Sequence, residues 1–326
     1  MLNIRAIIYT AILLAGSPVL SVPQAFSQGF TKQVTIVVPF SPGGIADLMA
    51  RLTAGHLKNR INQPVVVENR PGAGALLAGR YVSAAPPDGH VILCTTGSIA
   101  LSQLLVKDAN FDVRKDLTAL TLAAEGPSAL VVNASLPVTT VREFVAYAKA
   151  NAGKLNSGSV GYSSTTRLMT AWFEHVAGFT SILVPYPGTA PAHLALLQNE
   201  VQVLWDEPTL AARDMGPGST IRILALSGGD GRSSLLPTVP TLAESGYDID
   251  YRNRMGFFLP PKTPRDIVER VNAEIVSILR LPEIKGNTAL KGWDVVGTTS
   301  ERYAKLVSDD IDRWAEIVKA AGIEPQ

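Results

Sequence analysis

Cysteine and histidine are scarce in this sequence, which has one cysteine and four histidines among 326 residues. Cys94 cannot form a disulfide within the chain, so the fold must depend on its hydrophobic core, where we expect this thiol to be buried and inert. The histidines lack the spacing of metal ligands, so we expect each to be structural or on the surface. They are His56, His90, His175 and His193.

An excess of charge of one sign is also missing. The 29 basic and 28 acidic residues give a formal net charge of +1, and charged residues make up 17% of the chain. Proteins that follow a nucleic-acid backbone carry a clear excess of lysine and arginine on one face. We therefore expect no nucleic-acid partner.

Several enzyme motifs are absent as well. The sequence contains no G-x-x-x-x-G-K-[ST] phosphate-binding loop and no G-x-S-x-G nucleophile elbow. Gly72 and Gly74 follow a predicted strand, but Leu77 stands where a dinucleotide-binding fingerprint needs its third small residue. We predict no catalytic residue, no metal and no cofactor, and a secreted α/β hydrolase or transferase stays open as the alternative function.

The N-terminal segment has the features of a secretory signal peptide. One positive charge precedes a short apolar run, Ala6–Leu20, and the small residues Ala25 and Ser27 stand at positions −3 and −1 of a cut before Gln28. A membrane anchor is the competing interpretation, but the run is short and interrupted by proline for a span of about 20 residues. We predict that residues 1–27 are removed and that the mature protein works in the periplasm.

Strand-like and helix-like patterns alternate along the rest of the chain. Val34–Val38 is a β-branched run, and apolar residues at helical spacing follow it from Ile45 to Leu52. Similar pairs recur through the middle of the sequence, and their strands are almost continuously apolar. This alternation is typical of parallel sheets that helices cover on both faces.

Segments rich in proline and glycine divide the pattern into two lobes. They lie near Gly126-Pro127 and over Met255–Pro261. We predict two α/β lobes joined by two hinge crossings, the arrangement of a hinged clamp with a ligand cleft between the lobes. One lobe would contain residues 28–126 and 255–326, and the other residues 127–254.

Three loops share a design in which a strand ends, small or hydroxyl residues follow, and a helix begins. A helix N-terminus has free N–H groups and a partial positive charge, so each loop can hold an anion. In α/β sheets such loops gather in one crevice, although each could also be an ordinary cap. The loops are Phe40-Ser41-Pro42-Gly43-Gly44, Gly161-Tyr162-Ser163-Ser164-Thr165-Thr166 and Tyr186-Pro187-Gly188-Thr189-Ala190.

Charged residues beside these loops are further candidates for ligand contact. Asp47 lies in the first predicted helical turn, where it can cap the helix or contact a ligand. Arg167 opposes the dipole of its helix, and such a break with a local rule indicates a ligand or inter-lobe contact. Asp206 ends an apolar strand and is expected to point into the crevice. Among the histidines, His193 is expected to lie nearest to the pocket.

The sequence resembles the substrate-binding proteins of tripartite tricarboxylate transporters, also called Bug receptors, over nearly the whole mature chain. Several motifs that occur in the right order carry this resemblance. They are Val37-Val38-Pro39-Phe40-Ser41-Pro42-Gly43-Gly44 with Asp47 and Arg51, Val66-Val67-Glu68-Asn69-Arg70-Pro71-Gly72-Ala73-Gly74, Pro87-Asp88-Gly89, Val184-Pro185-Tyr186, Ala190-Pro191-Ala192, and Leu236-Pro237-Thr238-Val239-Pro240-Thr241 with Glu244 and Gly246.

The resemblance implies a type II periplasmic-binding-protein fold with a ligand carboxylate in its cleft. Backbone amides and ordered waters of the first loop and of the Ser/Thr-rich loop would hold this carboxylate. The implied ligands are di- and tricarboxylates, acidic amino acids and aromatic carboxylates. The partner would be a membrane permease, and the sequence leaves a sensor kinase open as the alternative.

The sequence departs from the family pattern at five positions. Ser163 replaces a glycine, Arg167 a histidine and Pro187 a basic residue. Gln202 stands where the family favours aspartate, and Arg254 where a tryptophan is usual. The two arginines suggest a ligand that is more anionic or more polar than usual.

The signal-peptide interpretation predicts a mature protein that begins near Gln28 and is found in the periplasmic fraction. The intact mass of the exported protein tests this directly. A mass that still includes residues 1–27 would contradict it.

Overall fold

The computed structural model describes residues 30–228, 232–233, 235–287 and 290–325. The predicted signal peptide, residues 1–27, lies outside the described residues. Within the described part of the chain, no helix is both long enough and apolar enough to cross a membrane.

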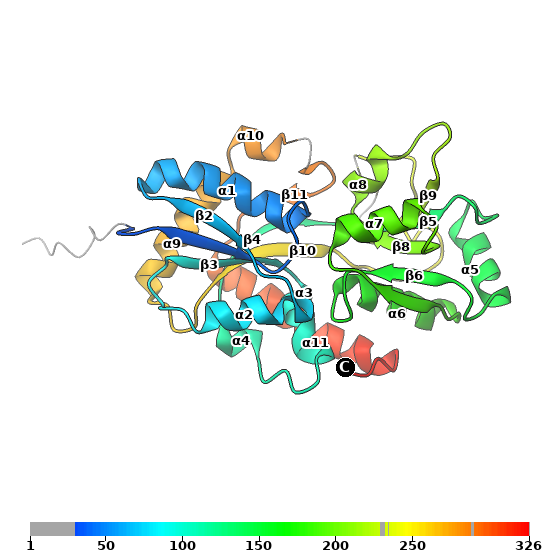
Figure 1. The fold of residues 1–326 in the computed structure, drawn as a ribbon, viewed down its shortest axis with the longest axis horizontal. Helices are drawn as coiled ribbons and strands as arrows, with labels where there is room; N and C mark the ends of the chain where they lie inside the picture. The colour runs from blue at the N-terminus through cyan, green and yellow to red at the C-terminus, as the bar shows by residue number, and fades with distance from the viewer. Residues whose placement is uncertain (1–29, 229–231, 234, 288–289, 326) are drawn as a thin grey trace, which may run out of the picture.

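The protein consists of two α/β lobes, each built around its own sheet (Figure 1). The sheet of lobe 1 has six strands in the order β11 (Asp294–Val295), β4 (Thr118–Gly126), β10 (Asn253–Leu259), β3 (Val91–Thr96), β1 (Val34–Val38) and β2 (Val65–Asn69). The sheet of lobe 2 has five strands in the order β7 (Ile182–Pro185), β6 (Asn156–Ser159), β8 (Val203–Asp206), β5 (Ala129–Asn133) and β9 (Ile221–Leu226).

Helices cover both faces of each sheet (Figure 1). Those of lobe 1 are α1 (Ile45–Ile61), the short 3-10 helix η1 (Ala73–Ala75), α2 (Leu76–Ser83), α3 (Ser98–Leu105), α4 (Val113–Asp116), α9 (Arg265–Leu279), α10 (Pro282–Lys285) and α11 (Ser300–Ala320). Those of lobe 2 are α5 (Val141–Ala150), α6 (Thr165–Ala177), α7 (Thr189–Leu197) and α8 (Pro208–Arg213).

Successive side chains of a strand point to opposite faces of the sheet, so each face packs against its own set of helices. In β1, Val34, Ile36 and Val38 pack in a core with residues of α1 and α9, whereas Val37 belongs to the core under α2, α3 and α11. Because both faces are covered, the strand reads as a continuous apolar run. Cys94 on β3 is buried, as predicted, and burial raises the pKa of its thiol far above the usual value.

The prediction that neighbouring strands are parallel is correct for only part of each sheet. β1 pairs in parallel with β2 and β3, and β6 with β7 and β8. β10 is antiparallel to β3 and β4, and β5 is antiparallel to β8 and β9. The reason is the path of the chain: β4 leaves lobe 1, β5 enters lobe 2, and β9 and β10 lead back in the opposite sense.

The second crossing precedes β10 instead of lying over Met255–Pro261. Met255 and its apolar neighbours are inside the strand, and Gly256 is a strand residue where a Cβ would lie 2.4 Å from Tyr303. The glycine therefore reflects close packing and is not a break between lobes. The lobe boundaries themselves, 28–126 with 255–326 and 127–254, stay a prediction.

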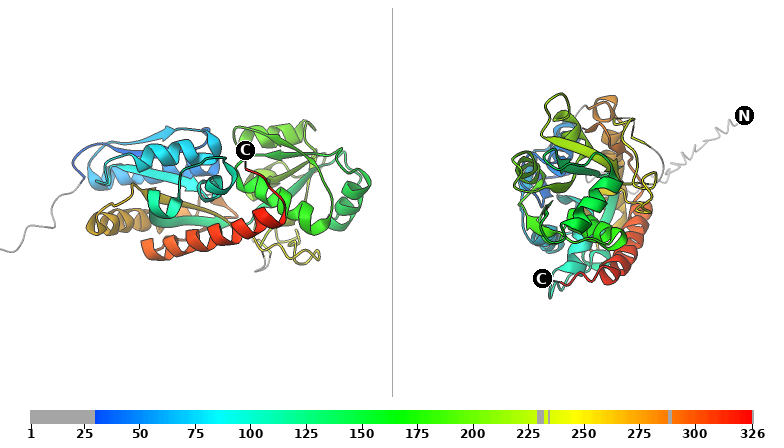
Figure 2. Two further views of the ribbon diagram at one scale, coloured as in Figure 1. Left: turned by 90° about the horizontal axis from the view of Figure 1, so that it is seen from below. Right: turned by 90° about the vertical axis from the view of Figure 1, so that its right-hand side faces the viewer.

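Hydrogen bonds through one serine join the two crossings. Ser227 Oγ accepts from the N–H of Ser128 at 2.8 Å and donates to the carbonyl of Tyr251 at 2.8 Å. The helix α11 also joins the lobes, because its C-terminal part contacts α6 (Figure 2). There the guanidinium of Arg313 lies over the ring of Trp172, 5.2 Å from its centroid.

Candidate ligand-binding cleft

Residues of both lobes line a cleft between the two sheets, which we call the inter-lobe cleft. From lobe 1 these are Phe40, Ser41, Pro42, Gly44, Ile45, Ala46, Thr96, Ser98 and Asn253. From lobe 2 they are Val160, Ser164, Thr165, Thr166, Gly188, Thr189, Ala190, Pro191 and Glu207.

Four helices begin at this cleft, because each follows a strand whose carboxyl end lies there. The strand β1 leads into α1, β3 into α3, β6 into α6 and β7 into α7. The first N–H groups of a helix have no partner within it, and the helix dipole makes this end partly positive. The cleft is therefore electropositive through its backbone, and no lysine, arginine or histidine side chain is among its described lining residues.

The first loop is supported from beneath by Asp47. One carboxylate oxygen of Asp47 accepts from the N–H of Gly43 at 3.0 Å, and Arg51 and Asn69 each donate to the same carboxylate at 2.9 Å. Asn69 also donates to the carbonyl of Phe40 at 2.9 Å. Burial alone would raise the pKa of Asp47, but these hydrogen bonds lower it. Asp47 thus braces the loop, and the N–H of Gly43 is already used.

The Ser/Thr-rich loop is held by its own hydroxyls. Ser164 caps α6, since its Oγ accepts from the N–H of Arg167 at 3.3 Å. It also donates to the carbonyl of Gly161 at 3.1 Å. Thr166 accepts from the N–H of Val160 at 2.9 Å. These bonds fix the start of α6 with Ser164 and Thr165 buried against the cleft.

The lobes are in contact at the rim of the cleft. A Cβ on Gly74 of lobe 1 would lie 2.5 Å from the Cβ of Ser163 of lobe 2. Across the cleft, Ser41 donates to the carbonyl of Pro187 at 3.5 Å, and its Cβ lies 3.7 Å from the position of a Cβ on Gly188. Ser163 is therefore an inter-lobe contact, and the structure has its cleft closed.

Nine of the sequence-predicted residues lie in the cleft lining: Phe40, Ser41, Pro42, Gly44, Ser164, Thr165, Gly188, Thr189 and Ala190. Gly43 faces the groove that adjoins the cleft along α1 and α7. The other six predicted residues lie elsewhere: Asp47, Tyr162, Ser163, Arg167, Tyr186 and Asp206. A role of any of these residues in ligand contact stays a prediction.

Arg167 lies on the far side of its helix from the cleft. Its guanidinium donates to the carbonyl of Tyr162 at 2.8 Å and faces a groove next to residues 321–324. Burial lowers the pKa of Arg167. Tyr186 is likewise directed outward, where its hydroxyl donates to Glu200 at 3.4 Å. The loop backbone reaches the cleft at both places, but these side chains turn away from it.

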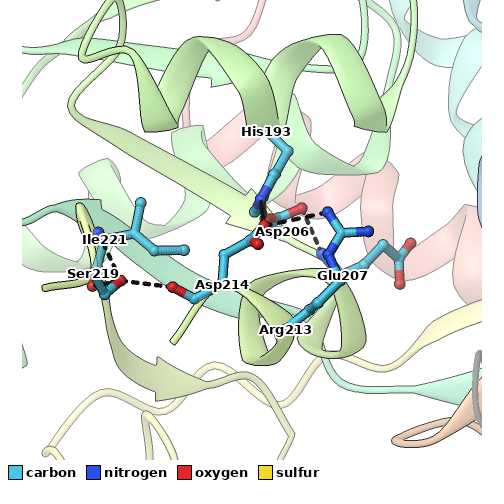
Figure 3. Close-up of polar contacts among 7 residues, drawn as sticks. All are labelled: His193, Asp206, Glu207, Arg213, Asp214, Ser219 and Ile221. Carbon is cyan, nitrogen blue, oxygen red and sulfur yellow. Dashed lines mark hydrogen bonds and ion pairs between the residues drawn. The ribbon is translucent and has the colours of Figure 1, made fainter. Parts of the chain in front are cut away.

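Asp206 lies in a buried polar cluster and is not at the cleft surface (Figure 3). Its Oδ2 is 2.5 Å from Nδ1 of His193, and its Oδ1 accepts from the N–H of Glu207 at 2.8 Å. Nε2 of His193 is 2.7 Å from Asp214, to which Arg213 donates at 3.3 Å. Both imidazole nitrogens face carboxylates, an arrangement that favours the doubly protonated ring. Burial alone would lower the pKa of His193, but Asp206 and Asp214 raise it.

The structure adds Thr96, Ser98, Asn253 and Glu207 to the cleft lining. The first two had a signal in the sequence, since Thr96 ends a strand and a helix begins at Ser98 after Gly97, much as in the other three loops. Asn253 and Glu207 had none. The described residues contain no group of three or more His, Cys, Asp or Glu side chains that could hold a metal.

Two α/β lobes, two chain crossings and a cleft of convergent helix N-termini define a two-lobed solute-binding protein. The comparisons give the family: residues 49–323 match the model of the tripartite tricarboxylate transporter family receptor. The chain belongs to this family.

Individual relatives cover most of the chain. A protein from the tcbD–tcbE intergenic region of Pseudomonas sp. strain P51 is 31% identical over 292 residues, 88% of this chain and 86% of its own. The structure of the periplasmic binding protein BugD is 27% identical with a TM-score of 0.84, covering 91% of this chain and 99% of its own. R. palustris Rpa4515 with adipate is 31% identical with a TM-score of 0.84 and the same coverage.

The His193 cluster predicts a pH-dependent contribution to stability. Because the folded pKa of His193 is raised, the contribution is complete below the unfolded value of about 6.5 and is lost as pH rises through the folded pKa. His193→Gln should lower the free energy of unfolding by about 1–3 kcal/mol at pH 5.5 and by less at pH 9. Denaturant unfolding at both pH values measures this. The exposed His175→Gln is the control, and an equal loss at both pH values would contradict the prediction.

Proposed function

We propose that this protein is a periplasmic receptor that captures a small organic carboxylate between its lobes and performs no chemistry on it. The observation that carries this proposal is the convergence of four helix N-termini, two from each lobe, on one cleft. Oriented N–H groups and neutral hydroxyls are suited to a carboxylate. A ligand that contacts both lobes stabilises their closed arrangement.

The ligand class follows from the cleft and from the family together. The related R. palustris protein binds adipate in its structure, as described above. The hydroxyls of Ser98 and Thr189 lie in the cleft lining, where they can donate to further oxygens of a dicarboxylate. Those of Ser41 and Thr96 donate to Pro187 and Ser98. We infer that the ligand is a di- or tricarboxylate or another small organic anion, and that the partner is a membrane permease; residues 1–27 would direct export.

A secreted hydrolase or transferase remains the second candidate from the sequence. Such an enzyme would need a hydroxyl nucleophile next to a base. In the cleft, the Ser164 hydroxyl bonds the carbonyl of Gly161 and lies 2.8 Å from Thr166 Oγ1. His193, which lines the groove next to the cleft, is held by two carboxylates. These contacts favour the receptor.

Ligand binding should raise thermal stability. A ligand that binds only the folded protein at about 100 times its Kd adds about 2.7 kcal/mol to the free energy of unfolding. Thermal denaturation with a panel of mono-, di- and tricarboxylates should give a rise in Tm for at least one member, with a decrease in the radius of gyration. A panel without any rise would argue against the carboxylate receptor.

Gly44→Pro tests whether backbone N–H groups bind the ligand. Gly44 has φ −81°, which proline adopts, and an added Cβ would meet no atom within 4 Å, so the fold should tolerate the change. The variant removes one N–H at the start of α1. Because a hydrogen bond to a charged group contributes about 1.5–3 kcal/mol, affinity should fall about 10- to 150-fold in calorimetric titration.

Gly44→Ala is the matched control, because it adds a Cβ at the same place and keeps the N–H. It should bind the ligand much more tightly than Gly44→Pro. Equal affinities of the two variants would show that the N–H of Gly44 does not bind the ligand.

A further inference from the structure

Glu207 is the one ionisable side chain among the described residues that line the inter-lobe cleft. It follows β8 directly and precedes Pro208, the first residue of α8. Its carboxyl accepts a hydrogen bond from Nε1 of Trp293 in lobe 1 at 3.0 Å. An acid therefore lies in a pocket that is otherwise built from helix N-termini, hydroxyls and apolar groups.

No cation of the described residues forms an ion pair with Glu207. The neighbouring Asp206 lies against His193, and Arg213 is directed to Asp214 (Figure 3). The indole of Trp293 donates to Glu207, and the charge of Glu207 acts on the buried phenol of Tyr251. His193 and Arg213 line the groove next to the cleft, where Glu207 also lies. The positive helix starts of α1, α3, α6 and α7 favour the ionised carboxyl, whereas burial in the cleft opposes ionisation.

Burial and the neighbouring Asp206 both favour the protonated form of this carboxyl over the charged form. Burial raises the pKa of Glu207 to about 8, and the charge of Asp206 acts in the same direction against the hydrogen bond from Trp293. An anion bound beside this carboxyl raises the pKa further, because two like charges in a partly dry cleft repel each other.

We propose that Glu207 selects fully anionic carboxylates over amino acids, by remaining protonated and donating a hydrogen bond to the ligand. This inference rests on the proposed function. A dicarboxylate meets the positive helix ends with both of its charges and accepts the Glu207 proton. An ammonium group would face the same helix ends unfavourably, and it would find a counter-charge only if Glu207 first lost its proton.

The selectivity is tested with ligand pairs that differ by one ammonium group. Adipate is compared with 2-aminoadipate, glutarate with glutamate, and succinate with aspartate, all by isothermal titration calorimetry. The purely anionic member of each pair that binds should bind at least tenfold more tightly at pH 7. An amino acid that binds as tightly as its partner would overturn the inference.

Proton uptake gives a second measurement on the wild-type protein. Above the pKa of free Glu207, binding must take up a proton, so affinity for the bound dicarboxylate should fall about tenfold between pH 7 and pH 9. Titration at pH 9 in two buffers with different heats of ionisation counts the protons directly. We expect close to one proton taken up, and a count near zero would overturn the inference.

Glu207→Gln separates this role from other sources of pH dependence. The variant cannot exchange a proton at this position, so its Kd should differ less than twofold between pH 7 and pH 9. Glu316→Gln makes the same substitution at an exposed position on α11 and should keep the wild-type slope. A Glu207→Gln variant that retains the slope overturns the inference.

The proposed function and this inference fail in different ways. If no carboxylate binds to the wild-type protein at any pH, the proposed function as a carboxylate receptor is wrong, and so is the proposed role of Glu207. If carboxylates bind without proton uptake, the proposed receptor function is supported and only the proposed role of Glu207 is wrong.

Discussion

Unpaired N–H groups at the starts of four helices are the constraint on which the rest of this structure depends. Each of these helices follows a strand that ends at the inter-lobe cleft, so the βα order of the chain points the positive ends of α1, α3, α6 and α7 at one place. Backbone donors in this arrangement need water or a ligand as acceptor. The two sheets, the crossings and the loop composition all serve to bring these helix starts together.

A pocket that binds an anion through its backbone must fix that backbone, and here side chains act mainly as supports. Asp47 holds the first loop through Gly43, with Arg51 and Asn69 as its partners. Ser164 does the same for the start of α6. Charged groups near the cleft lie behind its surface and pair with one another there. His193, for example, contacts the carboxylates of Asp206 and Asp214. Selectivity then falls to the few side chains that reach the lining, and Glu207 alone among the described ones can change its charge.

The fold class and the cleft loops could be predicted because they depend on local signals: apolar strands, helix periodicity, and glycine or hydroxyl residues between them. The directions of side chains could not. Arg167 and Asp206 stand next to cleft residues in the sequence, yet local hydrogen bonds turn Arg167 to Tyr162 and hold Asp206 against His193. The proline- and glycine-containing segment at Met255–Pro261 lies mostly within a central strand because packing against Tyr303 requires glycine there. Glu207 has no sequence signal, since its surroundings come from two lobes.

The position of α11 determines how such a molecule can open. This helix lies along both lobes on the side away from α7 and α8, and the buried residues on its side form one continuous core from Leu101 through Trp314 to Phe173 (Figures 1 and 2). A rotation that preserves this core must have its axis near α11. The two rims would then separate most at the α1 and α7 edge.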